Sequence, residues 1–168
     1  MAAPASAVAP IDAFIGLGAN LGDRAREIES AGAEIAALAT TVLVARSALY
    51  ASAPHDAPGG EYLNAVAHVR TALAPLELLR ALQAIESRHG RVRPFAGAPR
   101  TLDLDLLLYG DIVLASDELT LPHPRLHERA FVLVPLAEIA PGLVVPGRGR
   151  VVDLCAAVSS QRVAKLDR

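Results

Sequence analysis

The sequence predicts an α/β sandwich built on a mostly antiparallel sheet. Its 168 residues correspond to about one domain, because a typical domain has ~150 residues. Hydrophobic residues make up 52% of the chain and the mean hydropathy is +0.35, which is enough apolar side chain to bury a core. The predicted elements follow in the order β-α-β-β-α-β-β-α without an internal repeat, as in α+β folds. We expect a disordered tail over residues 1–10 and a single domain over residues 11–168.

A strand and a helix open the predicted domain. Residues 11–16 are a short apolar run that is typical of a strand. Asp23 is a suitable N-cap for the helix, because its short side chain can accept a hydrogen bond from the first turn. The apolar residues at helical spacing after it are Ile28, Ala31, Ile35 and Leu38. Further strands are predicted over residues 41–50, rich in β-branched side chains, and 63–70, where apolar and polar residues alternate.

The second half of the chain predicts another helix and a strand with acidic side chains. Pro75 suits the first turn of the helix, and Gly90 can end it. Residues 101–111 are expected to form a strand that ends in a Gly-Asp turn, with residues 112–114 as its return. The remaining predictions are an extended piece over residues 118–122, a helix over 128–138 and one closing helix or strand after residue 146.

The segment SAPHDAPGGE, at residues 52–61, has the composition of a loop. Loops of this length in compact domains are often lids over a site. An ordinary surface connection is the alternative interpretation.

Charge and residue usage exclude several classes of protein. Sixteen Lys and Arg against eighteen Asp and Glu give a formal net charge of -2, too balanced for diffuse coating of nucleic acid. Lys165 is the only lysine in the sequence. A Walker A loop, a protein kinase and a Schiff-base enzyme each need an internal lysine, so these classes are excluded.

The chain shows no signal for secretion or membrane insertion. The first ten residues lack a basic region and contain two prolines, unlike a signal peptide. No apolar stretch approaches the ~20 residues that span a bilayer. The single cysteine, Cys155, allows no intrachain disulfide and fits a reducing compartment. We therefore expect a cytoplasmic protein without a membrane or nucleic-acid partner.

The strongest chemical signal is the Asp-Leu-Asp motif formed by Asp103, Leu104 and Asp105. Alternation along a strand places both carboxylates on one face, with their backbones roughly 7 Å apart. Neighbouring carboxylates repel each other unless a cation is present, and such a face suits Mg²⁺, which also accepts phosphate oxygens. The alternative is a solvated outer face of an edge strand.

An arginine-rich segment directly before this motif favours the metal interpretation. Residues 87–102 contain a histidine and no acidic residue, and their arginines are Arg88, Arg91, Arg93 and Arg100. Guanidinium groups bind phosphate oxygens through two hydrogen bonds at once, so the layout suits a Mg-nucleotide. The alternative is a solvated loop in which Arg100 pairs with a nearby aspartate.

Two other motifs are weaker. Gly16, Gly18 and Gly22 do not have dinucleotide-binding spacing, and we expect these glycines to allow a close backbone turn beside a ligand. His123 and His127 are four residues apart, but a proline stands where a zinc protease motif needs glutamate. His123 is therefore interpreted as a phosphate contact and not as a zinc ligand.

Four sequence blocks occur in a characteristic order between roughly residues 14 and 146: IGLGANLGD, YLNAV, APRTLDLDLLLYG and LTLPHPRLHERAFVLVPL. Together they resemble the 6-hydroxymethyl-7,8-dihydropterin pyrophosphokinase family of folate biosynthesis. The resemblance implies a ferredoxin-like α+β fold and ATP as co-substrate. It also implies transfer of the ATP pyrophosphoryl group to the hydroxymethyl oxygen of the pterin, with release of AMP.

The resemblance implies roles for individual residues. Asp103 and Asp105 match a pair that binds two Mg²⁺ ions, and Arg93 and Arg100 match mobile catalytic arginines. The implied ATP contacts are Gln83, Glu86, Arg91, Arg93, Arg100, Thr120, His123 and Arg129. The implied pterin contacts are Ser52, Pro54, His55, Tyr62, Asn64 and Phe131. Among these, Tyr62 and Phe131 match aromatics that sandwich the ring, although they also suit ordinary strand and helix core positions.

The sequence departs from the family pattern at three places. Gly97 and Ala98 stand where many members have Trp-Gly, residues 52–55 replace the common Thr-Pro-Pro-Leu, and Glu118 lies where some members have arginine. We expect these changes to tune affinity and lid motion without abolishing activity. The alternatives are a non-catalytic module that binds nucleotide and pterin, and a Mg-dependent nucleotide hydrolase. A monomer is expected.

Overall fold

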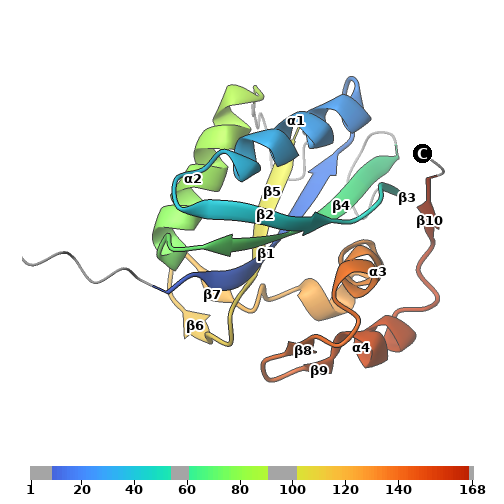
Figure 1. Cartoon of the computed structure of the whole chain (residues 1–168). Coiled ribbons are helices and arrows are strands. Elements are labelled where there is room, and N and C mark those ends of the chain that lie inside the picture. The colour runs from blue at the N-terminus through green and yellow to red at the C-terminus, as the bar shows by residue number, and fades with distance from the viewer. Residues whose placement is uncertain (1–8, 54–60, 91–101, 167–168) are drawn as a thin grey trace, which may run out of the picture.

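A six-stranded sheet lies at the centre of the fold in the computed structural model, which describes residues 9–53, 61–90 and 102–166. Its strands are β1 (Ile11–Ala19), β2 (Thr41–Arg46), β3 (Tyr50–Ser52), β4 (Tyr62–Thr71), β5 (Asp103–Tyr109) and β10 (Val163–Lys165). β4 and β1 are central, β5 lies beside β1, and β10 extends the sheet beside β3 (Figure 1). Every strand pair is antiparallel, as the sequence predicts.

Two helices, α1 (Arg24–Ala36) and α2 (Pro75–Arg88), cover one face of this sheet (Figure 1). The Asp23 side chain accepts a hydrogen bond from the first turn of α1, so the predicted N-cap is confirmed. Pro75 is the first residue of α2, and Gly90 has a φ of 75° just beyond its end. Both predicted signals for this helix are confirmed, because proline tolerates the first turn and glycine tolerates the left-handed conformation.

The opposite face of the sheet packs against α3 (Ala130–Ile139) and α4 (Val151–Ala157) (Figure 1). Alternation along β1 divides its side chains between the two layers. Ile15 and Leu17 belong to the core under α1 and α2, whereas Phe14 belongs to the core under α3 and α4. The α/β sandwich predicted from the sequence is therefore confirmed.

The helix predicted over residues 128–138 begins later than expected. A short 3-10 helix, η1 (Leu126–Glu128), comes first, and α3 starts at Ala130. Arg129 separates them with an extended backbone, at φ -120° and ψ 107°. The chain therefore changes direction at Arg129.

The strand predicted over residues 41–50 is interrupted, which corrects that prediction. β2 and β3 pair with the same side of β4, and residues 47–49 between them leave the regular ladder. The Ser47 hydroxyl there accepts a hydrogen bond from the Val66 N–H of β4 at 2.9 Å. A side-chain oxygen thus takes the place of a backbone acceptor. The strand propensities of the residues do not indicate such an interruption.

Two short hairpins complete the fold. One pairs β6 (Leu114–Ala115) with β7 (Thr120–Leu121), and the other pairs β8 (Val144–Val145) with β9 (Gly149–Arg150). The prediction that residues 112–114 return along the preceding strand is wrong, because Leu114 pairs with Leu121 instead. This arrangement buries Leu119 and Leu121 in the core under α2. The region after residue 146 forms both a helix and a strand, where we predicted only one of the two.

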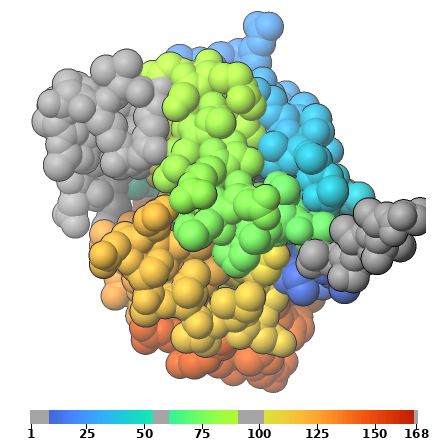
Figure 2. All heavy atoms as spheres, turned by 90° about the vertical axis from the view of Figure 1, so that its left-hand side faces the viewer, coloured from blue at the N-terminus to red at the C-terminus, as the bar shows by residue number. Residues whose placement is uncertain are grey.

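Helices α1 and α2 lie at the surface, each with one apolar side turned toward the core. Figure 2 shows α2 (green) beside α1 (blue), above the C-terminal part of the chain (orange to red). In the described ranges of the chain, no helix combines the length and the apolar character needed to cross a membrane.

Candidate active site

The two aspartates of the Asp-Leu-Asp motif lie on the sheet face that is turned toward α3. Asp103 and Asp105 are half-buried, whereas Leu104 between them is buried in the core under α1 and α2. Leu102 and Leu106 belong to the same core, so the leucines and the aspartates of β5 alternate between the two faces. The predicted placement of both carboxylates on one face is confirmed.

Asn64, Gly18 and Asp103 form a row across three neighbouring strands of the sheet. Gly18 of β1 is the register partner of Asn64 on β4 and of Asp103 on β5. Gly16 is likewise the partner of Asp105. Paired residues of neighbouring strands point to the same face, so two positions without side chains lie next to the carboxylates and the amide.

These glycines correct one prediction from the sequence. We expected Gly16, Gly18 and Gly22 to allow a close backbone turn, but Gly16 and Gly18 are regular strand residues. Only Gly22 of the three has a positive φ, at 64°. The first two glycines matter here because they lack a side chain above the sheet.

Arg129 carries a positive charge toward the carboxylate pair. Its guanidinium carbon lies 5.5 Å from the centre of the Phe131 ring, an arrangement typical of a cation–π contact. Burial lowers the pKa of Arg129, while the electrostatic attraction of Asp105 and Asp103 opposes that decrease. The extended backbone of Arg129 between η1 and α3 places it at this point of the fold.

His123 lies in the same electrostatic neighbourhood and is neutral at physiological pH. Burial and the nearby charge of Arg129 lower its pKa to about 4, although Asp103 acts in the opposite direction. The backbone N–H of Arg125 donates to His123 Nδ1 at 3.2 Å, so the neutral ring carries its proton on Nε2. The backbone N–H of His123 donates to the Leu107 carbonyl at 2.9 Å and attaches this loop to β5.

Asn64 and Ser52 form a buried polar pair on the other side of the glycine row. Asn64 Nδ2 donates to the Ser52 hydroxyl at 2.8 Å and to the Tyr50 carbonyl at 3.4 Å. A Cβ on Gly18 would lie 3.4 Å from Asn64 Oδ1. The amide orientation is therefore fixed by the fold, with its oxygen toward Gly18.

The two predicted aromatic contacts come from different layers. Tyr62 is the first residue of β4 and the register partner of Ser52. Phe131 lies in the first turn of α3 beside Arg129. Both side chains are half-buried. The structure thus places an aromatic residue beside the Asn64 end of the row and another beside the cationic end.

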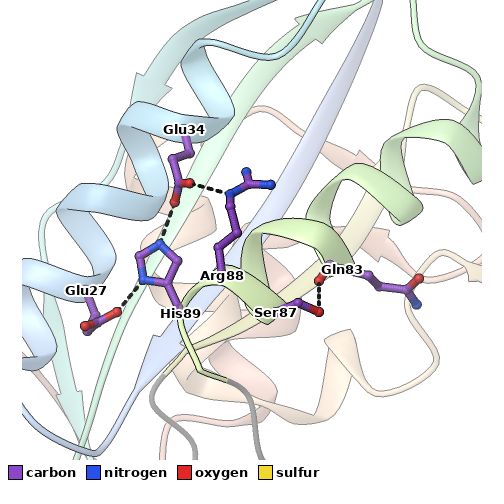
Figure 3. A network of polar contacts seen from close by, with 6 residues as sticks. All are labelled: Glu27, Glu34, Gln83, Ser87, Arg88 and His89. Carbon is purple, nitrogen blue, oxygen red and sulfur yellow. Dashed lines mark hydrogen bonds and ion pairs between the residues drawn. The ribbon is translucent and has the colours of Figure 1, made fainter.

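The predicted nucleotide contacts on α2 and β7 differ in exposure. Glu86 is buried, and its Oε2 accepts a hydrogen bond from the Leu104 N–H at 2.8 Å. Gln83 is exposed on α2, and its side chain points away from His89 and Glu34 (Figure 3). Thr120 is exposed on β7. Only Glu86 of these three contacts the strand that carries the aspartates through a hydrogen bond.

Five predicted site residues lie outside the described residues. They are Arg91, Arg93 and Arg100 of the arginine-rich segment, with Pro54 and His55 of the loop.

The C-terminal segment contributes to the site through Gln161, a residue that the sequence did not point to. Gln161, which follows α4, makes hydrogen bonds to the backbone on both sides of Arg129. These contacts join residues that are more than thirty positions apart, and no local pattern in the sequence signals them.

The chemistry of the site fits a divalent cation that is shared with a phosphate ligand. Asp103 and Asp105 offer hard oxygen ligands, and Arg129 lies close enough to interact with both. Within the described part of the chain, no three His, Cys, Asp or Glu side chains gather in a group that could hold a metal. A cation at the pair would therefore complete its shell with water or ligand oxygens, which is the usual coordination of Mg²⁺ at nucleotide sites.

Residues 14–141 match the family model of 7,8-dihydro-6-hydroxymethylpterin-pyrophosphokinase (HPPK). The 2-amino-4-hydroxy-6-hydroxymethyldihydropteridine pyrophosphokinase of Haemophilus influenzae is 42% identical over 160 residues, covering 94% of this chain and 99% of that protein. The protein of the same name from Pseudomonas aeruginosa is 44% identical over 156 residues, covering 91% of this chain and 95% of that protein.

Solved structures share the fold. The wild-type HPPK-DHPS of Plasmodium falciparum with pteroate aligns at a TM-score of 0.74 and 12% identity, over 90% of this chain and 45% of that chain. An HPPK-DHPS in complex with substrates aligns at 0.69 and 12% identity, over 88% and 43% of the two chains. The present chain thus spans less than half of these longer chains. The likeness confirms the expected ferredoxin-like α+β fold.

Proposed function

This chain belongs to the 7,8-dihydro-6-hydroxymethylpterin-pyrophosphokinase family, and we propose that it transfers pyrophosphate from ATP to 6-hydroxymethyl-7,8-dihydropterin in folate biosynthesis. The hydroxymethyl oxygen forms a bond to the β-phosphorus of ATP, the bond from that phosphorus to the α,β-bridging oxygen breaks, and AMP leaves. The hydroxyl proton is released. The observation that carries this proposal is the row of Asn64, Gly18 and Asp103, which joins a buried amide to the carboxylate pair.

Asp103 and Asp105 are the proposed ligands of two Mg²⁺ ions. When bound, Mg²⁺ neutralises phosphate charge and orients the reacting oxygens. The strand alternation of β5 holds the two carboxylates toward one face. Gly18 leaves room above the sheet beside Asp103, because it has no side chain. Over Gly16, the Leu107 side chain lies 3.5 Å from the place of a Cβ and fills that space.

Arg129 and His123 are the proposed protein contacts of the phosphate chain. The guanidinium of Arg129 offers fixed N–H donors, and its positive charge compensates the charge that develops on the leaving AMP. His123 acts as a neutral donor through Nε2, because its Nδ1 already accepts a bond from the backbone. Arg91, Arg93 and Arg100 would add further cations, as their positions in the sequence suggest.

The pterin is proposed to bind at the other end of the row. Asn64 keeps its Oδ1 toward Gly18, where it can accept a hydrogen bond from the polar edge of a flat heterocycle. Tyr62 and Phe131 are the proposed aromatic faces, since a planar ring stacks well on aromatic side chains. Ser52 supports the Asn64 amide, and Pro54 and His55 are proposed contacts from the loop.

Gln83 and Thr120 are proposed to contact the nucleotide from the surface of α2 and from β7. Glu86 was predicted in the same role. Its Oε2 holds the Leu104 N–H, so a contact with the nucleotide would use the same carboxylate that orients β5.

We further propose that the protein acts as a cytoplasmic monomer, with residues 11–168 as one domain. The predicted disordered tail falls mostly on residues 1–8, which lie outside the described residues. The balanced net charge of -2 supports small-molecule substrates over nucleic acid as the ligand. The antiparallel six-stranded sheet, with both faces covered by helices, supports a single domain.

The products of the reaction test this function. Purified protein is incubated with Mg-ATP, with and without the pterin, and the nucleotides are separated by chromatography. Pterin-dependent AMP supports the pyrophosphokinase. Formation of ADP, or cleavage of ATP without pterin, would indicate a hydrolase, and binding of both ligands without AMP would indicate a non-catalytic module.

A further inference from the structure

The side-chain amide of Gln161 bridges the peptide groups on both sides of Arg129. Its Nε2 donates to the Glu128 carbonyl at 2.7 Å, and its Oε1 accepts from the Ala130 N–H at 2.9 Å. A side-chain amide offers a donor and an acceptor side by side, so it can bind two peptide groups at once. The two bonds therefore define both the orientation of Gln161 and the path of the backbone through Arg129.

The backbone at Arg129 needs such a partner. Arg129 is extended between the end of η1 and the start of α3, and it makes no side-chain hydrogen bond as the N-cap of α3. The first N–H groups of a helix have no acceptor within the helix, and Ala130 is the first residue of α3. Gln161 supplies that acceptor from a segment far away in the sequence.

Gln161 is itself held in place from both directions. Its N–H donates to the Val158 carbonyl at 3.0 Å, and Val158 is buried against the core under α3 and α4. Two residues after Gln161, β10 begins and pairs with β3, with Val163 opposite Ser52. The turn between α4 and β10 is thus held at both ends by contacts that do not involve the Gln161 side chain.

From this geometry we propose that Gln161 is a positioning residue, which keeps the Arg129 guanidinium beside Asp103 and Asp105 through the backbone. The proposal deepens the proposed function and rests on it, because these contacts of Gln161 affect catalysis only if Arg129 binds the phosphates. Without the two hydrogen bonds of Gln161, the residues around Arg129 can adopt other backbone angles. The guanidinium would then spend less time over Phe131 and beside the carboxylates.

A double-mutant cycle between Gln161 and Arg129 tests the proposal. Gln161→Met keeps the length of the side chain and removes both hydrogen bonds, whereas Gln161→Glu keeps the acceptor for the Ala130 N–H. Ser160→Ala, an exposed change in the same turn, is the matched control. The measured quantity is the dissociation constant of Mg-bound α,β-methylene-ATP, a non-cleavable analogue, by titration calorimetry, with thermal melting of each variant alongside.

We expect Gln161→Met to raise the dissociation constant of the analogue by about five- to tenfold, since each hydrogen bond contributes modestly to stability. Gln161→Glu should raise it less. In the Arg129→Ala background, Gln161→Met should cause no further loss, because the two residues act as one unit. Ser160→Ala should bind like the wild type. Steady-state kinetics should show a higher KM for ATP in Gln161→Met, with a smaller change in the KM for the pterin.

If the wild type binds the analogue normally, two results would overturn the proposal that Gln161 positions Arg129. One is unchanged affinity in Gln161→Met, and the other is an equal loss with and without Arg129, which would assign Gln161 to general stability. Absence of nucleotide binding or of AMP formation in the wild type would instead overturn the proposed function itself.

Discussion

The carboxylate of Glu86 accepts a hydrogen bond from the backbone N–H of Leu104 at 2.8 Å. Leu104 is the residue between the two aspartates of the proposed metal site, and Glu86 is buried with 2% of its surface exposed. Among the described strands of the main sheet, β5 pairs with β1 alone, and the Leu104 N–H points to the other edge of β5, where it bonds to Glu86. Glu86 thus supplies an acceptor for the backbone N–H between the two aspartates of β5.

Replacement of Glu86 by leucine should weaken both stability and activity. The Leu104 N–H would lose its acceptor in a buried place, which costs about 1–3 kcal/mol of unfolding free energy. Urea denaturation measures that loss, and the steady-state rate of AMP formation measures the effect on the aspartates. Glu86→Gln is the matched control, because its amide oxygen can still accept the bond. A leucine variant with wild-type stability and rate would contradict this role.

Gly18→Ala should reduce activity without disturbing the fold. The added methyl group would stand between Asn64 and Asp103, within 3.4 Å of Asn64 Oδ1, and alanine is no worse than glycine in a strand. A misplaced methyl group in a binding pocket costs about 1–3 kcal/mol, so the KM for the pterin should rise at least tenfold. Gly142→Ala, where an added Cβ meets nothing within 4 Å, is the control for kinetics and melting temperature. An unchanged KM in Gly18→Ala would show that no substrate passes over this row.

The contact between α1 and α2 should depend on pH through His89 (Figure 3). The His89 ring lies between the carboxylates of Glu27 and Glu34, and Arg88 adds a bond to Glu34 at 3.0 Å. Burial opposes protonation of His89, but the hydrogen bonds to Glu27 and Glu34 outweigh it and raise its pKa above 6.5. The pKa of Glu34 is lowered below 4.5, because its bonds to His89 and Arg88 outweigh the effect of burial.

The signs of these shifts define a window of pH. The His89 contribution to stability is complete below its unfolded pKa of 6.5 and is lost as pH rises through its raised folded value. The Glu34 contribution is present above 4.5 and is lost as pH falls through its lowered folded value. The melting temperature of His89→Gln should therefore fall furthest below the wild type between about pH 5 and 6.5, and the gap should narrow in alkaline buffer. Ser87→Ala on the same turn controls for local loosening of α2, and a gap that stays constant with pH would contradict this account.

Local chemistry explains how much of this structure could be predicted from the sequence. Asp103 and Asp105 share a face because strand alternation is a property of the backbone alone. Asp23 and Gly90 mark helix ends for equally local reasons. These features need no knowledge of which strand pairs with which.

The features that sequence reasoning missed depend on long-range pairing. Gly18 becomes part of the site only because β1 lies between β4 and β5, so the expectation of a turn at that glycine was wrong. Ser47 interrupts the strand over residues 41–50 through a bond to β4, and Gln161 reaches Arg129 from the far end of the chain. Gly18 is placed by strand pairing, whereas Ser47 and Gln161 each use a side chain in place of a backbone partner on another element. No local residue pattern encodes either kind of contact.

The central claim is that Asp103 and Asp105 carry the transfer of pyrophosphate. The most direct measurement is the rate of pterin-dependent AMP release by the wild type, Asp103→Asn and Asp105→Asn at saturating Mg-ATP, with EDTA as the metal-free control. Asparagine keeps the shape of each side chain and removes its charge. We predict that EDTA abolishes the wild-type reaction and that each variant loses several kcal/mol of transition-state stabilisation, a decrease of about a thousandfold, with an unchanged melting temperature. Turnover close to the wild-type rate in both folded variants would contradict the claim.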